Sequence, residues 1–482
     1  MSRTGGRGGN IEACPASPGQ VPTACRAHDA GSGEQGTRSR SERSLRILLH
    51  GINYHPETTS TGRYTGEMGR WLASRGHEVR VVTAPPYYPL WRVGKGYSGG
   101  RYAREVLDGA LVWRCPLWVP RRPSGKARIA HLASFASSSA PVMLGQARIF
   151  RPDVVVMVEP TLLCLPHSWA AARAAGAPLW VHVQDFELEA ALGLGIMRAG
   201  AARGAFRAAE GGLFSLADRV STISEAMRRR LVEKGVPEER TFLMPNWADL
   251  GRVRPARPDE GVRRVLGASP GDVLVLYAGS MGEKQGLGLV LDAAQRLRGR
   301  PEVRFALVGA GPARAALEKA ARGRGLRNVR FCDVWPEEDL PRLLAAGDIH
   351  LVVQRREAAD LVMPSKLTNI LAAGRPAVAT AAPGTELHRV VAGGGCGLVV
   401  PPEDAAALAR GIADLAGDAA LRERLGAAAR RYAEERLDRE GILSRFEAEL
   451  ARLVAGCSRG RSRGARPSGR AANVVRVPRR LV

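Results

Sequence analysis

A serine and a lysine stand side by side where a short helix is expected to begin, within the stretch 360–380 (DLVMPSKLTNILAAGRPAVAT). Pro364 suits a helix entry, Ser365 is a favourable N-cap residue, and apolar residues recur at helical spacing over 366–373. The hydroxyl and the ammonium would lie at a helix amino end, where unpaired N–H groups and the helix dipole favour an anion. We predict that Ser365 and Lys366 bind a phosphate or diphosphate. The alternative is a capping serine beside a solvated lysine.

A glycine-rich loop at 279–286 (GSMGEKQG) offers a second place for the same anion. It follows an expected strand at 273–278, its glycines let backbone N–H groups approach a phosphate, and Lys284 adds positive charge. Together the two sites could hold a diphosphate from both sides. A further turn at 309–311 (GAG) lacks the last glycine of a dinucleotide fingerprint, because Arg314 stands there. A dehydrogenase is therefore disfavoured.

Polar residues also follow two expected strands in the first half of the chain. The loop 51–61 (GINYHPETTST) comes after a strand at 45–50, and Gln184 and Asp185 come after a strand at 179–183. Ligands of parallel α/β sheets bind at the carboxyl ends of strands, so we expect both segments to border a site. His182, taken alone, is better explained as a buried histidine with satisfied hydrogen bonds.

The elements that must position these residues alternate between strand and helix along most of the chain. This alternation predicts two doubly wound, Rossmann-like α/β domains facing each other across a cleft. Residues 85–123 are expected to be irregular, and 404–416 and 419–455 to form closing helices. The predicted divisions are a disordered tail at 1–44, a first domain at 45–250, a linker at 251–270, a second domain at 271–440, a closing helix at 441–456 and a basic disordered tail at 457–482.

The composition favours anionic partners. Among 482 residues, 71 Lys and Arg against 47 Asp and Glu give a net charge of +24, part of it in the tail 457–482. Such a surface attracts phospholipid, nucleotide or nucleic acid. We expect neither a signal peptide nor a membrane span, because no long uninterrupted apolar run is present.

Nothing in the motifs predicts a metal. The seven cysteines are scattered without a Cys-x-x-Cys pair, and the chain has neither His-x-x-x-His nor Asp-x-Asp. This pattern argues against a disulfide framework and against a zinc site. We therefore expect no metal site and no cofactor, with lysine and arginine as counter-charges for a phosphate.

A long, mostly apolar helix is expected at 124–150, preceded by Arg121 and Arg122. One interpretation is a core helix with a solvated basic approach. The other is an interfacial helix, whose apolar face meets lipid while the basic residues meet anionic head groups. The sequence leaves both open.

Seven stretches, in the same order as in a known family, resemble the retaining GT-B glycosyltransferases of family 4. The resemblance covers about 46–453 and is closest to bacterial exopolysaccharide enzymes of the colanic-acid fucosyltransferase type. The stretches are NYHPETTSTGRYTGEM (53–68), HVQDFELEA (182–190), STISEAM (221–227), MPNWADL (244–250), YAGSMGEKQGL (277–287), LVGAGPAR (307–314) and MPSKLTNILAAGRP (363–376).

The resemblance implies a role for each candidate residue. Asn53, Glu57 and His182 would lie on the acceptor side, whereas Asp185, Lys284 and Lys366 would act in catalysis. Asn369 stands where relatives commonly have a ribose-binding Glu, Ser280 where many have an Arg, and Leu361 where a further Glu would fall. The implied donor-binding set is Gly62, Gln184, Gly279, Ser280, Gly282, Gly311, Ser365 and Asn369.

The family mechanism implies front-face departure of the nucleotide with retention, using positioning and electrostatic stabilisation without a metal or a protein nucleophile. The implied substrates are a GDP- or UDP-linked sugar and a lipid-diphosphate-linked saccharide in exopolysaccharide or cell-envelope glycan synthesis. The implied place is cytoplasmic, peripheral on the inner face of the cell membrane, against an anionic surface. Two alternatives stay open: a nucleotide-sugar 2-epimerase of the same fold, and a basic nucleic-acid-binding protein, although no nucleic acid is expected as partner.

Overall fold

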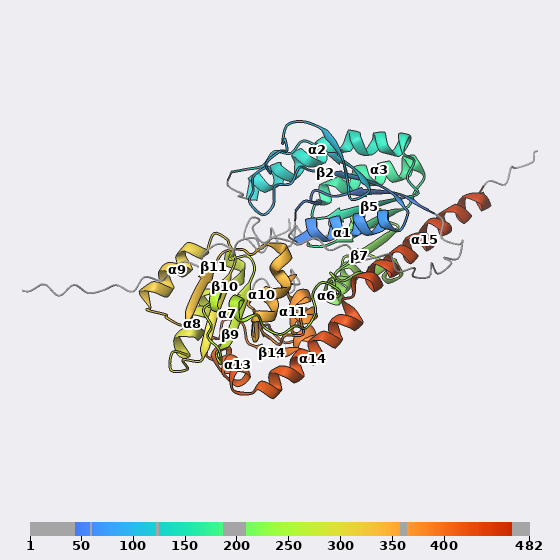
Figure 1. Cartoon of the computed structure of the whole chain (residues 1–482). Helices are drawn as coiled ribbons and strands as arrows, with labels where there is room; N and C mark the ends of the chain where they lie inside the picture. Colours follow the sequence, from blue (N-terminus) through green and yellow to red (C-terminus); the bar gives the residue numbers. More distant parts are fainter. Residues whose placement is uncertain (1–43, 58–59, 122–124, 187–208, 357–363, 465–482) are drawn as a thin grey trace, which may run out of the picture.

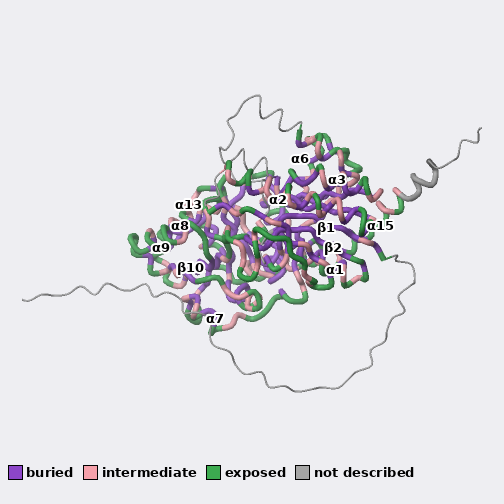
Figure 2. The backbone as a smooth tube through the Cα atoms, turned by 90° about the horizontal axis from the view of Figure 1, so that it is seen from above, coloured by how far each residue is buried: buried purple, intermediate pink, exposed green. Residues whose placement is uncertain are grey.

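The computed structural model describes residues 44–57, 60–121, 125–186, 209–356 and 364–464, without the side chains of 60 and 458–464. Within them, two parallel sheets each carry helices on both faces and form two bodies, one above the other in Figure 1. Buried residues concentrate along the strands, as Figure 2 shows for β1 and β2. The prediction of two doubly wound α/β domains is confirmed.

The first sheet has eight strands in the order β3-β4-β2-β1-β5-β6-β7-β8. Every neighbouring pair is parallel except β3 with β4. The carboxyl ends of β1 and β6 therefore point to the same edge. The strands are β1 (Arg46–His50), β2 (Glu78–Thr83), β3 (Ala103–Leu107), β4 (Ala110–Arg114), β5 (Val154–Glu159), β6 (Leu179–Val183), β7 (Arg219–Thr222) and β8 (Thr241–Leu243).

The β3–β4 hairpin corrects the expectation that 85–123 is irregular. Its two-residue turn is Asp108-Gly109, with φ of 50° and 81°. An Asp-Gly turn with two left-handed residues matches the twist of a tight hairpin. The signal was thus present in the sequence, but β3 is an exposed edge strand and lacks the apolar alternation of a buried one.

Helices cover the two faces of the first sheet with separate apolar clusters. One cluster joins Phe135 and Leu165 to Leu48, and the other joins Tyr64 and Leu72 to residues of a late helix. Helical segments of this domain include α1 (Ser60–Ser74), α2 (Gly125–Ile149), η1 (Leu162–Cys164), α3 (Leu165–Ala175), α6 (Glu225–Glu233) and η2 (Glu238–Arg240).

Helix α2 is a core helix. Its buried residues recur every fourth position, from His131 through Phe135 and Ser139 to Met143, and this face packs on α3. Of the two interpretations that the sequence leaves open, the core helix agrees with this packing, because that face is covered by protein. No helix in the described part of the chain is long and apolar enough to cross a membrane.

The second sheet has six parallel strands in the order β11-β10-β9-β12-β13-β14. Its strands are β9 (Val273–Ala278), β10 (Val303–Val308), β11 (Val329–Cys332), β12 (Ile349–Val352), β13 (Ala377–Thr380) and β14 (Gly397–Val400). Its helical segments are η3 (Glu283–Gln285), α8 (Gly288–Arg296), α9 (Arg314–Gly323), η4 (Glu337–Asp339), α10 (Leu340–Ala346), α11 (Lys366–Ala372), α12 (Glu386–His388), the π-turn η6 (Arg389–Gly393) and α13 (Ala405–Gly417).

A short helix, α7 (Glu260–Val265), lies inside the predicted linker 251–270. Arg263 of α7 donates to the carbonyl of Ala346 at 2.8 Å and pairs with Asp348 at 2.8 Å. Because both partners belong to the second domain, the second half of that segment is part of the domain and not a linker.

The last two helices return the chain to the first domain. Arg430 of α14 (Ala419–Arg436) donates to the carbonyl of Ala372 at 2.8 Å, whereas Phe446 of α15 (Arg439–Gly464) stacks edge-on with Trp180, 5.0 Å between centroids. The single helix expected at 419–455 breaks where Asp438 pairs with Ala248. Residues 457–464 continue α15, so that part of the predicted tail is helical; 1–43 and 465–482 lie outside the described residues.

Candidate active site

The ammonium of Lys366 is buried at the start of α11. Its Nζ lies 3.6 Å from the centroid of the Tyr277 ring, and it has no hydrogen-bond partner among the residues that the structure describes. Burial lowers the pKa of Lys366 from 10.5 to about 7. A buried cation without an anion is costly, so this position is suited to receive a negative ligand.

The glycine-rich loop after β9 meets this ammonium. Gly279 has a φ of +144°, and a Cβ there would lie 2.9 Å from Nζ of Lys366. Only glycine allows both the backbone conformation and the approach. The loop and the α11 start, predicted separately to contact one anion, are therefore adjacent.

The turn 309–311 supports the loop from the next strand. A Cβ on Gly309 would fall 1.9 Å from the carbonyl oxygen of Gly279, and one on Gly311 would fall 2.4 Å from that of Met281. The Met281 N–H also donates to the carbonyl of Ala310 at 2.8 Å. Gly311 thus lies where close backbone packing requires a glycine.

Asn369 lies one turn after Lys366 on α11, and its Oδ1 is buried without a hydrogen-bond partner in the described residues. Residues three apart share a face of a helix. An unpaired buried polar atom costs about 1–3 kcal/mol. Two such atoms on one helix face leave a place where a polar ligand would restore the missing interactions.

The remaining predicted donor residues lie further along the glycine-rich loop and at the start of α11. Lys284 is exposed on η3, and Ser280 is exposed, its carbonyl accepting from the Tyr277 hydroxyl. The Gly282 N–H donates to Gln285 at 3.0 Å. The expected serine cap is wrong: Ser365 has helical φ and ψ of −59° and −22°, and its side chain makes no capping hydrogen bond.

In the first domain, His182 and Gln184 form a buried network. The Gln184 amide donates to His182 Nε2 at 2.9 Å and to Asn246 Oδ1 at 3.0 Å, and His182 Nδ1 contacts Ser221 Oγ at 2.8 Å. Burial lowers the pKa of His182 from 6.5 to about 4, so the ring is neutral at pH 7. The interpretation of His182 as a satisfied buried histidine agrees with this geometry.

Glu57 anchors the loop after β1. Its buried carboxylate accepts from the N–H groups of Tyr87 and Tyr88 at 2.8 and 2.9 Å and from the Asn53 amide at 2.8 Å. Burial raises its pKa, and these hydrogen bonds act in the opposite direction. A Cβ on Gly62 would lie 2.7 Å from Glu57. Asn53, Glu57 and Gly62 therefore contact one another, and these contacts hold the loop after β1 in its conformation.

Asp185 lies at the carboxyl end of β6 and interacts electrostatically with Tyr88. Burial raises the pKa of Tyr88, and the charges of Glu57 and Asp185 add to this. The Asn53 loop, Tyr88 and Asp185 thus border one region at the strand ends of the first sheet.

A cavity of about 840 Å³ lies between the domains. Asn246 and Ser224 line it from the first domain, and Thr368 and Leu371 of α11 from the second. On a helix, positions 368 and 371 lie opposite 366 and 369. Helix α11 therefore separates this cavity from Lys366, and we place the candidate site for an anion on the Lys366 side.

Sequence reasoning missed three residues of this region. Asn246 follows β8 at the strand-end edge, so the rule applied to Gln184 could have found it. Tyr88 and Tyr277 carry no such signal, because a tyrosine in a Pro-rich loop or a buried strand is ordinary. Only packing shows that the ring of Tyr277 lies beneath the ammonium.

Comparisons with known proteins agree with this architecture. Two family models match: a glycosyl transferase 4-like domain over residues 59–247 and glycosyl transferases group 1 over residues 272–418. The glycosyl transferase WcaI of Escherichia coli (strain K12), named for colanic acid biosynthesis, is 46% identical over 409 residues, which are 83% of this chain and 98% of that protein.

Two solved structures share the fold. Sucrose-phosphate synthase from Thermosynechococcus elongatus is 19% identical, with a TM-score of 0.67 over 86% of this chain and 100% of that chain. Anabaena HepE, solved with UDP and glucose, is 18% identical, with a TM-score of 0.62 over 84% of this chain and 99% of that chain. At these identities the likeness concerns the fold alone.

Proposed function

The chain belongs to the GT-B glycosyltransferases of family 4, and from this premise we propose that it transfers a sugar, with retention, from a nucleoside-diphosphate sugar to a lipid-diphosphate-linked saccharide. The observation that carries the proposal is the buried ammonium of Lys366 beside the Gly279 loop. Among the described residues no hydrogen-bond partner meets this ammonium, so it offers a positive charge to a bound diphosphate.

Lys366 would stabilise the leaving nucleotide. As the bond to the sugar breaks, negative charge grows on the diphosphate, and a fixed cation in a water-poor site stabilises it strongly. A bound diphosphate would also raise the pKa of Lys366 from about 7, so donor binding keeps the ammonium protonated. We infer that this charge, with Lys284 at the exposed edge, makes a metal unnecessary for transfer.

Asn369 would bind the nucleoside. Its buried Oδ1 lacks a partner in the described part of the chain, and a ribose hydroxyl is a suitable donor. An amide accepts less strongly than a carboxylate, so this contact is weaker than one to a Glu. Backbone groups of Gly279, Ser280 and Gly282 would approach the phosphates, with Ser365 beside them.

The acceptor would lie over the first sheet. Asp185 and Gln184 would face the transferred sugar, with Asn53, Glu57 and His182 holding the surrounding loop in place. Hydrogen bonds among these residues position the region before a substrate arrives. We propose Tyr88 as a further acceptor contact, because it is 40% exposed next to Asp185.

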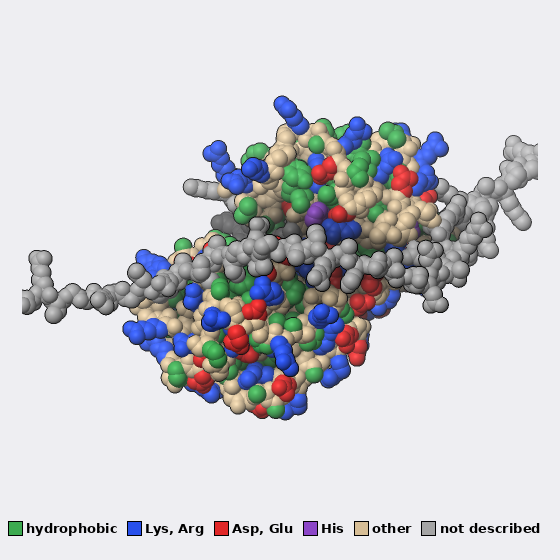
Figure 3. Space-filling view, in the orientation of Figure 1, with side chains coloured by type: hydrophobic (Ala, Val, Ile, Leu, Met, Phe, Trp, Pro, Cys, Tyr) green, Lys and Arg blue, Asp and Glu red, His purple; other side chains and the backbone are tan. Residues whose placement is uncertain are grey.

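A membrane surface would present the acceptor. Large apolar side chains are exposed near the start of α2, with Leu90 at 77%, Trp118 at 52% and Ile129 at 56%. Lys126 and Arg128 lie beside them, and basic side chains project from the outer part of the first domain (Figure 3). Exposed apolar groups flanked by cations suit an anionic interface. We propose a peripheral position on the cytoplasmic face of the membrane.

The similarity to WcaI supports a place in exopolysaccharide synthesis of the colanic-acid type. HepE was solved with UDP, whereas the donor base here could be uracil or guanine. The relatives described above lend no support to a 2-epimerase, which would release an epimerised nucleotide sugar without an acceptor. A nucleic-acid-binding protein would instead show affinity that falls steeply with salt.

The test is a binding and turnover panel on the purified full chain. GDP, UDP, their sugars, NAD and a short DNA are compared by thermal shift with and without magnesium, because a ligand of the folded state raises the midpoint. We expect a magnesium-independent shift with one diphosphate nucleotide, and transfer from its sugar to a lipid-linked acceptor. A shift only with NAD or DNA would refute the proposal, as would undiminished transfer by Lys366→Ala when the exposed-lysine control Lys319→Ala is also active.

A further inference from the structure

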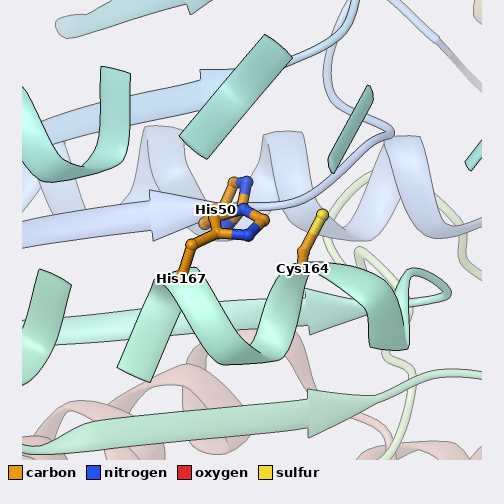
Figure 4. A group of neighbouring side chains, drawn as sticks. All are labelled: His50, Cys164 and His167. Carbon is orange, nitrogen blue, oxygen red and sulfur yellow. The ribbon is translucent and has the colours of Figure 1, made fainter. Parts of the chain in front are cut away.

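Three side chains that are remote in sequence meet behind the first sheet: His50 at the end of β1, Cys164 at the end of η1, and His167 in α3 (Figure 4). One possible ligand atom of each lies within 4.8 Å of the other two. His50 and Cys164 are 0% and 1% exposed, whereas His167 is half-buried. None of the three has a role in the transfer reaction proposed above.

The hydrogen bonds of His50 determine which nitrogen carries its lone pair. Ser168 Oγ donates its single hydrogen to the carbonyl of Cys164 at 2.8 Å, so it accepts from His50 Nδ1 at 2.7 Å. The ring is then neutral, with Nε2 as the acceptor. This Nε2 is buried and has no hydrogen-bond partner within the described ranges.

His167 is held in a similar way. Ser139 Oγ donates to the carbonyl of Ala136 at 3.4 Å and contacts His167 Nε2 at 3.2 Å. In the tautomer in which Ser139 accepts from Nε2–H, Nδ1 of His167 carries the lone pair. Metal-ligating histidines commonly donate their other N–H in this way, which sets the tautomer and the ring orientation.

An ordinary packed core explains this arrangement less well. The His50 ring does lie 5.7 Å from that of Phe135 and 5.0 Å from that of His167. Packing alone, however, leaves a buried acceptor nitrogen without a hydrogen bond in the described part of the chain, which is energetically unfavourable. A cation at Nε2 removes that cost.

We propose that His50, Cys164 and His167 form a binding site for a divalent cation of the zinc class. Zinc bonds of about 2.0 Å to nitrogen and 2.3 Å to sulfur place tetrahedral ligand atoms about 3.3–3.5 Å apart, so the three atoms, which lie within 4.8 Å of one another, would move closer on binding. On binding, the Cys164 thiol loses its proton to water and a sulfur–metal bond forms. Three protein ligands leave the fourth position for a water molecule.

Such a cation would join β1 to α3. The loop with Asn53 and Glu57 begins directly after His50, so an occupied site would stiffen the attachment of that loop. The expected effect is on stability, since transfer itself is proposed to need no metal. The site does not depend on the proposed function, and either can fail without the other.

The experiment titrates the reduced, chelator-treated full chain with Co²⁺ as a spectroscopic probe and then with Zn²⁺ against a chromogenic chelator. We expect one equivalent of Co²⁺ to produce thiolate-to-cobalt charge-transfer absorption, and Zn²⁺ to abolish it and raise Tm. Ser168→Ala should lower Zn²⁺ affinity about 10- to 100-fold, as loss of a histidine partner typically does. Cys164→Ala should abolish the absorption.

Cys115→Ala is the matched control, because Cys115 is equally buried in the same domain but lies outside the group. It should bind as the unaltered chain does. If Cys164→Ala does not fold, His167→Gln replaces it, since His167 is half-buried and tolerates change better. Absence of the charge-transfer absorption in the unaltered chain, or equal binding by the Cys164 and Cys115 variants, would overturn the proposal.

Discussion

The polar site residues of α11 in the second domain and those of the Glu57 loop and the His182 network in the first differ in their hydrogen bonding. In the second domain, Lys366 Nζ and Asn369 Oδ1 are buried and lack hydrogen-bond partners in the described part of the chain. In the first, Glu57 accepts three hydrogen bonds and His182 contacts Ser221 and Gln184. The start of α11 thus holds groups that await a ligand, whereas the Glu57 loop and the His182 network are organised in advance by their own contacts. Ligand binding should therefore stabilise the second domain most.

The largest expected effect comes from removing the buried ammonium of Lys366. Lys366→Met should lower kcat/KM for transfer about 10²- to 10³-fold, as loss of one stabilising donor for a developing charge does. The same change should raise the free energy of unfolding by about 1 kcal/mol or more, because it removes an unpaired buried charge. Steady-state kinetics and urea denaturation measure the two effects. Lys319→Met, on the exposed face of α9, should change neither; equal loss of stability in both variants would contradict the contrast.

The pH dependence of stability should separate Lys366 from the buried histidines, because their pKa shifts fall in different pH windows. The pKa of Lys366 falls from 10.5 to about 7 on folding, so the unfolded chain binds more protons between these values and stability rises with pH there. The pKa of His182 falls from 6.5 to about 4, so stability decreases as pH drops through that lower window. At about 1.4 kcal/mol per pKa unit, the shifts correspond to about 5 kcal/mol for Lys366 and about 3 kcal/mol for His182.

Denaturation curves from pH 4 to 10 check these slopes. A saturating diphosphate nucleotide should flatten the alkaline slope, because it raises the pKa of Lys366, and should leave the acid slope unchanged. Lys366→Met should flatten the dependence of the free energy of unfolding on pH in the alkaline window. His182→Gln should reduce this dependence in the acid window. A nucleotide that alters only the acid slope would show that it does not bind at Lys366.

A smaller effect is expected from removing the hydrogen bonds that Glu57 accepts in the first domain. Glu57→Ala leaves the N–H groups of Tyr87 and Tyr88 and the Asn53 amide without their acceptor, which should lower the free energy of unfolding by about 2 kcal/mol. Glu57→Gln retains acceptor oxygen and should lose less. Nucleotide affinity, measured by calorimetry, should be nearly unchanged in both; a large loss would mean that the two regions are coupled.

The smallest expected effect on stability comes from the serines that precede two helices, Ser365 before α11 and Ser224 before α6. Ser365→Ala should change stability by less than about 0.5 kcal/mol, since its hydroxyl caps nothing. Ser224→Ala should cost about 1 kcal/mol, because Ser224 Oγ accepts from the N–H of Met227 at 3.2 Å. Thermal denaturation compares the two variants. Equal losses would show that Ser365 caps α11 in solution.

The sequence by itself determined the domain architecture and the segments that form the site. Alternating apolar strands and amphipathic helices report burial locally, so the two sheets, α11 and the Gly279 loop could be predicted. The Asp108-Gly109 turn was equally local and could have revealed β3 and β4. Seven stretches in order were enough to recognise the family.

Only the tertiary structure decided which residues are buried and what they meet. Lys284 and Lys366 are both lysines in segments predicted to bind a phosphate. Lys284 is exposed, whereas the ammonium of Lys366 lies over the ring of Tyr277. His50 joins Cys164 and His167 because β1 pairs with β5, which leads into η1 and α3. Desolvation and unpaired polar atoms depend on contacts between remote segments, and local sequence patterns contain no information about those contacts.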